Sequence, residues 1–183
     1  MVAGYFEPAM QQPVPMYLAP HDAAEKVLYD HLVDENGNVT FPIDLTKVAD
    51  DLGIKVYEAD LRPNIAGLIV QADESEPVEI FLNKEDPQSR RRFTLAHELG
   101  HYVDRKSRGD DQLIGLVDYR DEVSSRWTDP QEVWANRFGA ALLMPAFAVR
   151  NLWREGYTIV RMAKYFGVSK ESMSYRLSAL GLS

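Results

Sequence analysis

The chain has 183 residues, of which 45% are hydrophobic, so it is long enough to bury the core of one domain of ordinary size. It contains no cysteine, which excludes disulfide bonds, Cys-ligated zinc or iron–sulfur sites and thiol nucleophiles. Its formal net charge of −8 opposes non-specific attraction of the whole molecule to a nucleic-acid backbone. Any metal ion must be held by histidine and carboxylate side chains.

The N-terminal segment, residues 1–20, is predicted to be a flexible, proline-rich tail, because four prolines deny it a continuous helix or a central strand. It lacks a basic region ahead of a hydrophobic stretch, so it does not resemble a secretory signal. The longest nearly apolar run, residues 139–149, is too short for a membrane-spanning helix of about 20 residues. We therefore expect a cytoplasmic protein without a membrane partner.

Two helices and three strands are expected next. A helix begins at Asp22 and ends near Gly37, and Asp44 is expected to cap a second, short helix that stops at Gly53. Three β-rich runs follow, separated by loops so short that antiparallel neighbours are favoured. These runs comprise residues 54–59, 67–72 and 78–82.

Longer helices follow the strands. Helical periodicity covers residues 87–105, and another helix opens with Pro130 at its first position and runs to Pro145. The charged residues 107–128 between them are predicted to be mostly loop. Residues 158–182 are predicted to form two further helices.

The first of these longer helices contains the motif His-Glu-Leu-Gly-His. A spacing of four places His97 and His101 on one face, where both imidazoles can bind one ion. Glu98 is rotated away by about 100°, within reach of a metal-bound water without being a ligand. Zinc lowers the pKa of such a water to about 7, so Glu98 can act as general base in peptide-bond hydrolysis. A chance His pair on a solvated helix is the less favoured interpretation in a chain with four histidines.

A catalytic zinc site needs a third protein ligand. The extended motif HExxHxxGxxH is absent, because Asp104 and Ser107 occupy the positions of its glycine and third histidine. The other histidines, His21 and His31, lie far upstream and are expected to be surface or boundary residues. A carboxylate is therefore expected, and the downstream candidates are Asp104, Asp118, Glu122 and Glu132.

Glu132 is the best placed of these carboxylates. It lies near the start of a helix whose small residues Ala135, Gly139 and Ala140 permit close approach to the motif helix. A structural role is also open, because Glu132 falls at position N3 if Asp129 is the N-cap. A glutamate there commonly returns a hydrogen bond to the cap residue. The residues alone leave both roles open.

Four segments together resemble the ImmA/IrrE family of metallopeptidases, and the similarity extends over roughly residues 22–182. They are RRFTLAHELGH (91–101), EVWANRFGAALLMP (132–145), PIDLTKVADDLGIKV (42–56) and GLIV (67–70). The resemblance implies a minimal thermolysin-like zincin core. It also implies a protease that acts as an anti-repressor or in a stress response by cleaving a helix-turn-helix regulator.

The same resemblance implies a role for each residue of the motifs. Carried over onto this sequence, His97, His101 and Glu132 become the ligands of Zn²⁺ and Glu98 becomes the catalytic base. It assigns no residue to stabilisation of the transition state.

The C-terminal residues 158–182 are expected to form a helix-turn-helix-like pair, with Gly167 in the turn and Ser169 as N-cap of the second helix. Residues 150–183 carry six basic and two acidic residues, hence a charge of +4, which leaves −12 for residues 1–149. This charge is compatible with DNA contact, but DNA affinity usually requires dimerised half-sites. Packing on the core or docking of a partner is therefore favoured. The candidate contact residues are Lys170, Ser172, Tyr175 and Arg176.

We therefore expect an α+β fold in three parts. Residues 1–20 form the tail, residues 21–149 the zinc metallopeptidase core with a small three-stranded antiparallel sheet packed on helices, and residues 150–183 the helix-turn-helix-like segment. The expected function is that of a zinc-dependent endopeptidase that cleaves a helix-turn-helix transcriptional repressor. The alternative is a non-proteolytic regulatory or toxin–antitoxin partner that binds a helix-turn-helix protein or DNA through the same scaffold.

Overall fold

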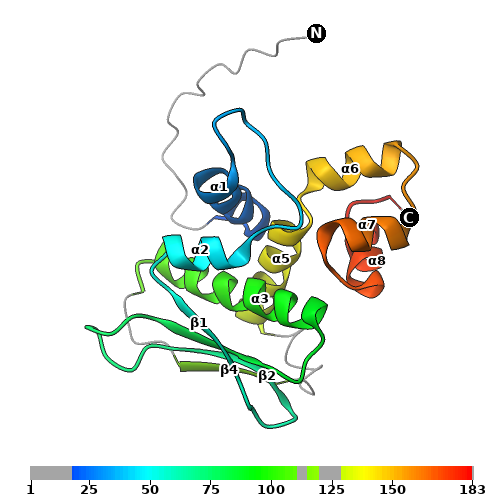
Figure 1. Ribbon diagram of the computed structural model, residues 1–183. Helices are drawn as coiled ribbons and strands as arrows, with labels where there is room; N and C mark the ends of the chain where they lie inside the picture. The colour runs from blue at the N-terminus through cyan, green and yellow to red at the C-terminus, as the bar shows by residue number, and fades with distance from the viewer. Residues whose placement is uncertain (1–17, 111–114, 120–128, 183) are drawn as a thin grey trace.

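The computed structural model describes residues 18–110, 115–119 and 129–182. Within these residues it has seven helices and one four-stranded sheet, which confirms the α+β class. Helix α3 (Gln88–Ser107) lies between the sheet on one side and helices α1 (Pro20–Leu32) and α5 (Pro130–Leu143) on the other (Figure 1). None of the described helices is both long and apolar enough to cross a membrane.

The sheet differs from the predicted one in strand number and in direction. Strand β1 runs parallel to β3, whereas β2 is antiparallel to both β3 and β4. The predicted three-stranded antiparallel sheet is therefore wrong, and the sheet is mixed with the order β1-β3-β2-β4. The strands are β1 (Lys55–Ala59), β2 (Ile65–Val70), β3 (Glu79–Asn83) and β4 (Gly115–Tyr119).

Two separate causes explain these differences. The short loops do reverse the chain twice, but β3 inserts between β1 and β2, and two reversals leave β1 and β3 parallel. Strand β4 lies within residues 107–128, which were expected to be mostly loop. A strand of five residues in a charged stretch carries too short a pattern to be recognised.

Helix α2 agrees with the prediction, whereas α1 begins at Pro20 instead of Asp22 and ends at Leu32, well before Gly37. Helix α1 buries its apolar face against α5, and the prolines before residue 18 lie outside the described residues. Helix α2 (Leu45–Asp51) packs on α3 and β1. The Asp44 side chain caps α2 by accepting hydrogen bonds of 3.1 Å from the backbone N–H groups of Thr46 and Lys47.

Helices α3 and α5 pack closely because glycines face the contact from both sides. A Cβ on Gly100 would lie 3.1 Å from the Cα of Ala135, and a Cβ on Gly139 would lie 3.3 Å from the carbonyl carbon of Ala96. All four residues are buried. This close approach brings the first turn of α5 to the face of α3 that carries the two motif histidines.

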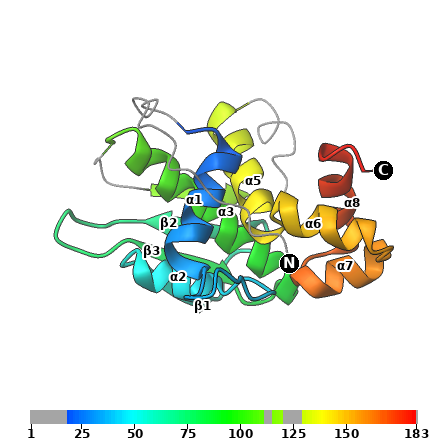
Figure 2. The ribbon, with the colours of Figure 1, turned by 90° about the horizontal axis from the view of Figure 1, so that it is seen from above.

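Three C-terminal helices lie together at one end of the molecule (Figure 2). They are α6 (Ala146–Arg154), which the sequence did not predict, α7 (Ile159–Phe166) and α8 (Lys170–Ala179). The turn between α7 and α8 agrees with the prediction. Gly167 has φ +67°, and the Ser169 hydroxyl accepts a hydrogen bond of 3.0 Å from the Ser172 N–H.

The helix pair α7–α8 contacts the rest of the chain through both of its helices. The Arg176 Nε donates a hydrogen bond of 2.9 Å to the carbonyl oxygen of Met144 at the end of α5. The Phe41 ring centroid lies 5.2 Å from that of Phe166 and 5.4 Å from that of Tyr165. The boundary expected between residues 149 and 150 falls within α6, and the division into domains stays a prediction.

Candidate metal centre

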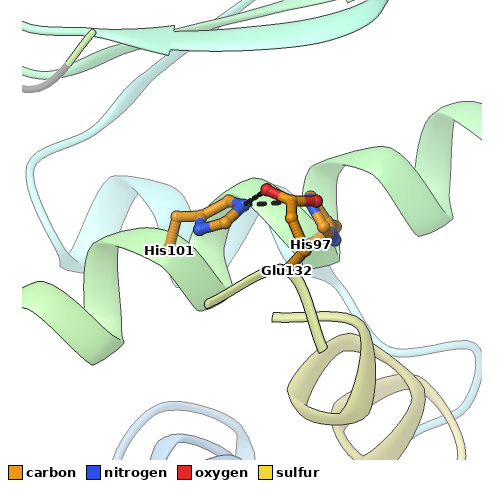
Figure 3. A group of neighbouring side chains, drawn as sticks. All are labelled: His97, His101 and Glu132. Atoms are coloured by element: carbon orange, nitrogen blue, oxygen red, sulfur yellow. Dashed lines mark hydrogen bonds and ion pairs between the residues drawn. The ribbon is translucent and has the colours of Figure 1, made fainter. Parts of the chain in front are cut away.

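Three side chains converge where α3 meets the start of α5 (Figure 3). The His101 Nε2 lies 3.0 Å from the His97 Nε2 and 3.0 Å from the Glu132 Oε1. The His97 Nε2 lies 3.4 Å from the Glu132 Oε2. The three candidate ligand atoms lie within 4.8 Å of one another, and no second group of this kind occurs among the described residues.

The local structure explains this convergence. One helical turn separates His97 from His101, so their rings lie side by side with centroids 4.6 Å apart and planes at 85°. Both histidines are buried, whereas the Glu132 side chain keeps 26% of its surface exposed. The group is therefore buried on its α3 side and partly open on its α5 side.

The described contacts of Glu132 are with the motif histidines, while another residue caps α5. Asp129 caps α5 by accepting a hydrogen bond of 2.8 Å from the Gln131 N–H. The Glu132 carboxylate is directed toward the two motif histidines, one oxygen to each. These are the contacts that a metal ligand would make.

Asn136 is a functional candidate to which the sequence analysis gave no role. The His97 Nδ1–H donates a hydrogen bond of 3.1 Å to the Asn136 Oδ1. This bond places the proton on Nδ1 and leaves the Nε2 lone pair directed at the other two side chains. The spacing of four between Glu132 and Asn136 on one helix was the available signal.

The group is electrostatically arranged to hold a positive charge. Burial alone would lower the pKa of His97, but its hydrogen bond with Glu132 and the nearby charges of Glu98 and Asp118 raise that pKa overall. The hydrogen bonds from His101 and His97 hold the pKa of Glu132 well below its usual range. Two imidazole lone pairs and a carboxylate are favourable neighbours only with a cation between them, either a proton or a metal ion.

The donor set fits zinc. A tetrahedral zinc ion with bonds of about 2.0–2.1 Å separates its ligand atoms by about 3.3 Å. The observed separations of 3.0, 3.0 and 3.4 Å lie around that value. Two imidazole nitrogens and one carboxylate are also the ligands of catalytic zinc sites that keep a fourth position open.

Glu98 lies next to this group without belonging to it. It is only 1% exposed and lies against strand β2, where a Cβ on Gly67 would be 3.5 Å from the Glu98 Oε1. Its charge is close enough to contribute to the raised pKa of His97. A buried carboxylate beside the candidate ligands is placed to accept a proton during a reaction at the centre.

The structure does not bring the other sequence candidates into the group. Asp104 is buried in an ion pair one turn beyond the motif, and Asp118 lies on β4. Glu122 lies outside the described residues. His21 and His31 belong to α1 and form contacts with aspartates elsewhere.

The four candidate contact residues of α8 fall into two pairs. Lys170 and Tyr175 are exposed, Tyr175 by 74%. Ser172 and Arg176 are half-buried, and their described hydrogen bonds go to the N-cap serine of α8 and to the carbonyl of Met144, the C-cap of α5. Contact of any of the four with DNA or a partner stays a prediction.

Comparison with known proteins agrees with the resemblance. Residues 49–178 match the peptidase M78 family model, which is described as the IrrE N-terminal-like domain. The radiation response metalloprotease IrrE of Deinococcus deserti is 36% identical over 104 residues, which cover 54% of this chain and 35% of that protein. The chain therefore spans about a third of the length of this curated relative.

A solved structure shares the fold. A Mycobacterium tuberculosis transcriptional regulator superposes with a TM-score of 0.58 at 22% identity, over 87% of this chain and 46% of that one. Identity at this level shows likeness of fold alone. The matched family segment includes all three residues of the candidate metal centre and Glu98, and it covers more than half of the chain. The chain thus belongs to the peptidase M78 family of metallopeptidases, which is the ImmA/IrrE family.

Proposed function

We propose that this chain is a zinc-dependent endopeptidase in which His97, His101 and Glu132 bind the zinc ion and Glu98 is the general base. One observation carries the proposal: the ligand atoms of three side chains lie within 4.8 Å of one another, next to a buried carboxylate. Membership of a metallopeptidase family supports a metal cofactor and a protein substrate.

Each residue has a defined task in this proposal. His97 and His101 bind through Nε2 and Glu132 through a carboxylate oxygen, while Asn136 holds the His97 ring in place. Zinc, when bound, polarises the scissile carbonyl and makes water more acidic. Glu98 removes a proton from the attacking water and delivers it to the nitrogen of the leaving peptide.

The proposed substrate is a helix-turn-helix transcriptional repressor in the cytoplasm. The family resemblance supports this substrate class, and charge supports it independently. Residues 1–149, which contain the metal centre, carry a net charge of −12, and a DNA-binding repressor presents a basic surface. Attraction between the two would raise the rate of encounter and would weaken with salt.

Cleavage in a complete protein mixture tests the proposal and identifies the substrate in the same experiment. The zinc-loaded protein is incubated with a protein extract of its source, and newly formed N-termini are identified by mass spectrometry. The matched control is Glu98→Gln, which preserves shape and zinc ligands but cannot accept the proton. We expect new N-termini with the wild type and a reduction of about 10²–10⁴-fold with Glu98→Gln. Equal cleavage by both proteins would refute the mechanism.

The surface of α8 supports the non-proteolytic alternative. Lys170 and Tyr175 are exposed on this helix, within a segment of net charge +4. If binding through α8 were the whole function, Glu98→Gln would act in cells like the wild type, and Lys170→Ala with Tyr175→Ala would not. The peptidase proposal expects the reverse for Glu98→Gln.

A further inference from the structure

Gly67 lies where strand β2 crosses the motif helix α3. A Cβ at this position would be 2.5 Å from the Thr94 Cγ2, 3.1 Å from the Phe81 carbonyl oxygen and 3.5 Å from the Glu98 Oε1. Non-bonded carbon atoms are most favourably separated by about 3.5–4.0 Å. Strand β2 therefore lies so close to α3 that no side chain fits between them.

The surroundings of Gly67 leave an added methyl group no easy escape. Thr94 is 3% exposed and branched at Cβ, which restricts rotation about χ1. The Phe81 carbonyl oxygen belongs to the backbone of β3. Phe81 pairs with Leu68 of β2 in the sheet, so this oxygen cannot move independently of β2. An alanine at position 67 must therefore push β2 and α3 apart.

Thr94 and Glu98 are one helical turn apart and lie on the same face of α3. The Glu98 carboxylate is thus enclosed between its own helix and the backbone of β2 at Gly67. The contact with α5, which brings Glu132 to the histidines, lies elsewhere on α3 and involves Gly100 and Gly139. Gly67 therefore controls the spacing between α3 and the sheet, whereas Gly100 and Gly139 control the spacing between α3 and α5.

We propose that Gly67 is a positioning residue for the general base. Its missing side chain lets β2 approach α3 closely enough to hold the Glu98 carboxylate in one orientation beside the metal centre. The inference rests on the proposed peptidase function and adds to it a residue of the sheet. It also gives the segment GLIV, residues 67–70, a role in catalysis beyond membership of a strand.

The test compares two glycine substitutions in strands. Gly67→Ala moves the sheet away from Glu98, whereas Gly115→Ala on β4 is the matched control, because its Cβ would meet nothing within 4 Å. Zinc affinity is measured by competition with a chelator, and cleavage with an internally quenched random peptide library as the probe. For Gly67→Ala we expect kcat to fall on the order of 10²-fold, with KM and zinc affinity unchanged. Gly115→Ala should match the wild type in all three.

A second substitution tests whether the contact itself is responsible. Thr94→Ser removes the methyl group that an alanine at position 67 would meet first. The double variant Gly67→Ala/Thr94→Ser should therefore recover most of the lost kcat, while Thr94→Ser alone stays close to the wild type. Their effects on the free energy of unfolding should be non-additive, which reports the contact independently of activity. If the Gly67→Ala protein does not fold, the inference still requires that the double variant folds and cleaves the peptide probe.

Gly100→Ala supplies the reference for a defect in metal binding. Its Cβ would lie 3.1 Å from the Cα of Ala135, so this variant should lose zinc affinity together with activity. A Gly67→Ala protein that behaves in this way, that keeps the wild-type kcat, or that is not rescued by Thr94→Ser would overturn the inference. A wild type as inactive as Glu98→Gln would instead refute the proposed peptidase function, and the inference with it.

Discussion

The Glu132 Oε1 lies 3.0 Å from the Nε2 of His101, across the contact between α5 and α3. Glu132 occupies the first turn of α5, where Asp129 already accepts a hydrogen bond from the backbone. A glutamine has nearly the shape of a glutamate and can still serve a capping box, but it lacks the negative charge. Substitution to glutamine therefore separates the two roles that the residue types alone left open.

Glu132→Gln should weaken zinc binding by more than about 100-fold, because it removes a direct ligand, and loss of a group that only orients a ligand already costs about 10–100-fold. The melting temperature of the metal-free protein should stay nearly unchanged at alkaline pH, where His97 has lost its extra proton. Zinc dissociation constants and melting curves of the wild type and the variant provide the measurement. Glu122→Gln is the control and should bind zinc normally. Normal affinity in Glu132→Gln with a large loss in Glu122→Gln would transfer the ligand role to Glu122.

The partner of His97 leads to a second prediction. Asn136→Leu keeps the size of the side chain but removes the oxygen that accepts from the His97 Nδ1–H. We expect zinc affinity to fall by about 10–100-fold, because the ring loses its fixed tautomer and orientation. Asn136→Asp retains an acceptor and should bind zinc tightly. Asn151→Leu, at an exposed position of α6, is the control, and an equal loss there would contradict a specific role for Asn136.

The pairing of the two histidines could be predicted because it depends on helix geometry alone. The spacing of His97 and His101 on a helix requires that they share a face, and the small residues of α5 signal its close approach to α3. The spacing of Glu132 and Asn136 places both on one face of α5, but spacing alone does not reveal the role of Asn136. The role of Asn136 depends on which ring nitrogen of His97 faces His101 and Glu132. The packing of α5 on α3 determines that orientation.

Tertiary pairing explains what the sequence did not reveal about the sheet. Each of the first three strands was recognised from local patterning, but the position of β3 between β1 and β2 depends on contacts between segments distant in the chain. Strand β4 pairs with β2 around an irregularity between Ile65 and Gly67, which no local pattern marks. The close contact of Gly67 with Thr94 likewise follows only from how the sheet packs on α3.

Arg176 yields a prediction about the attachment of the C-terminal helices. Its Nε donates to the Met144 carbonyl, and the guanidinium is partly buried, which lowers its pKa. Arg176→Met should lower the free energy of unfolding by about 1–3 kcal/mol. Lys170→Ala, at an exposed position of the same helix, should change it by no more than about 0.5 kcal/mol. Urea denaturation measures both, and equal effects would argue against Arg176 as an anchor.

The pH dependence of stability in the metal-free protein follows from the pKa directions of His97 and Glu132. The pKa of His97 is raised above its usual value of 6.5, so its contribution is fully present below that value and is lost as pH rises through the raised pKa. The pKa of Glu132 is lowered from its usual 4.5, so its contribution is present above that value and is lost as pH falls through the lowered pKa. Their mutual stabilisation should therefore be largest between pH 4.5 and 6.5.

The difference in free energy of unfolding between the wild type and Glu132→Gln, measured with a chelator present, isolates this contribution. We expect it to be largest between pH 4.5 and 6.5 and to decline toward alkaline pH as His97 loses its proton. Zinc must displace that same proton, so zinc affinity should rise with pH until His97 is neutral and then level off. A stability difference that stays constant through the alkaline range would mean that His97 carries no extra proton beside Glu132, and the two curves together would locate the pKa of His97.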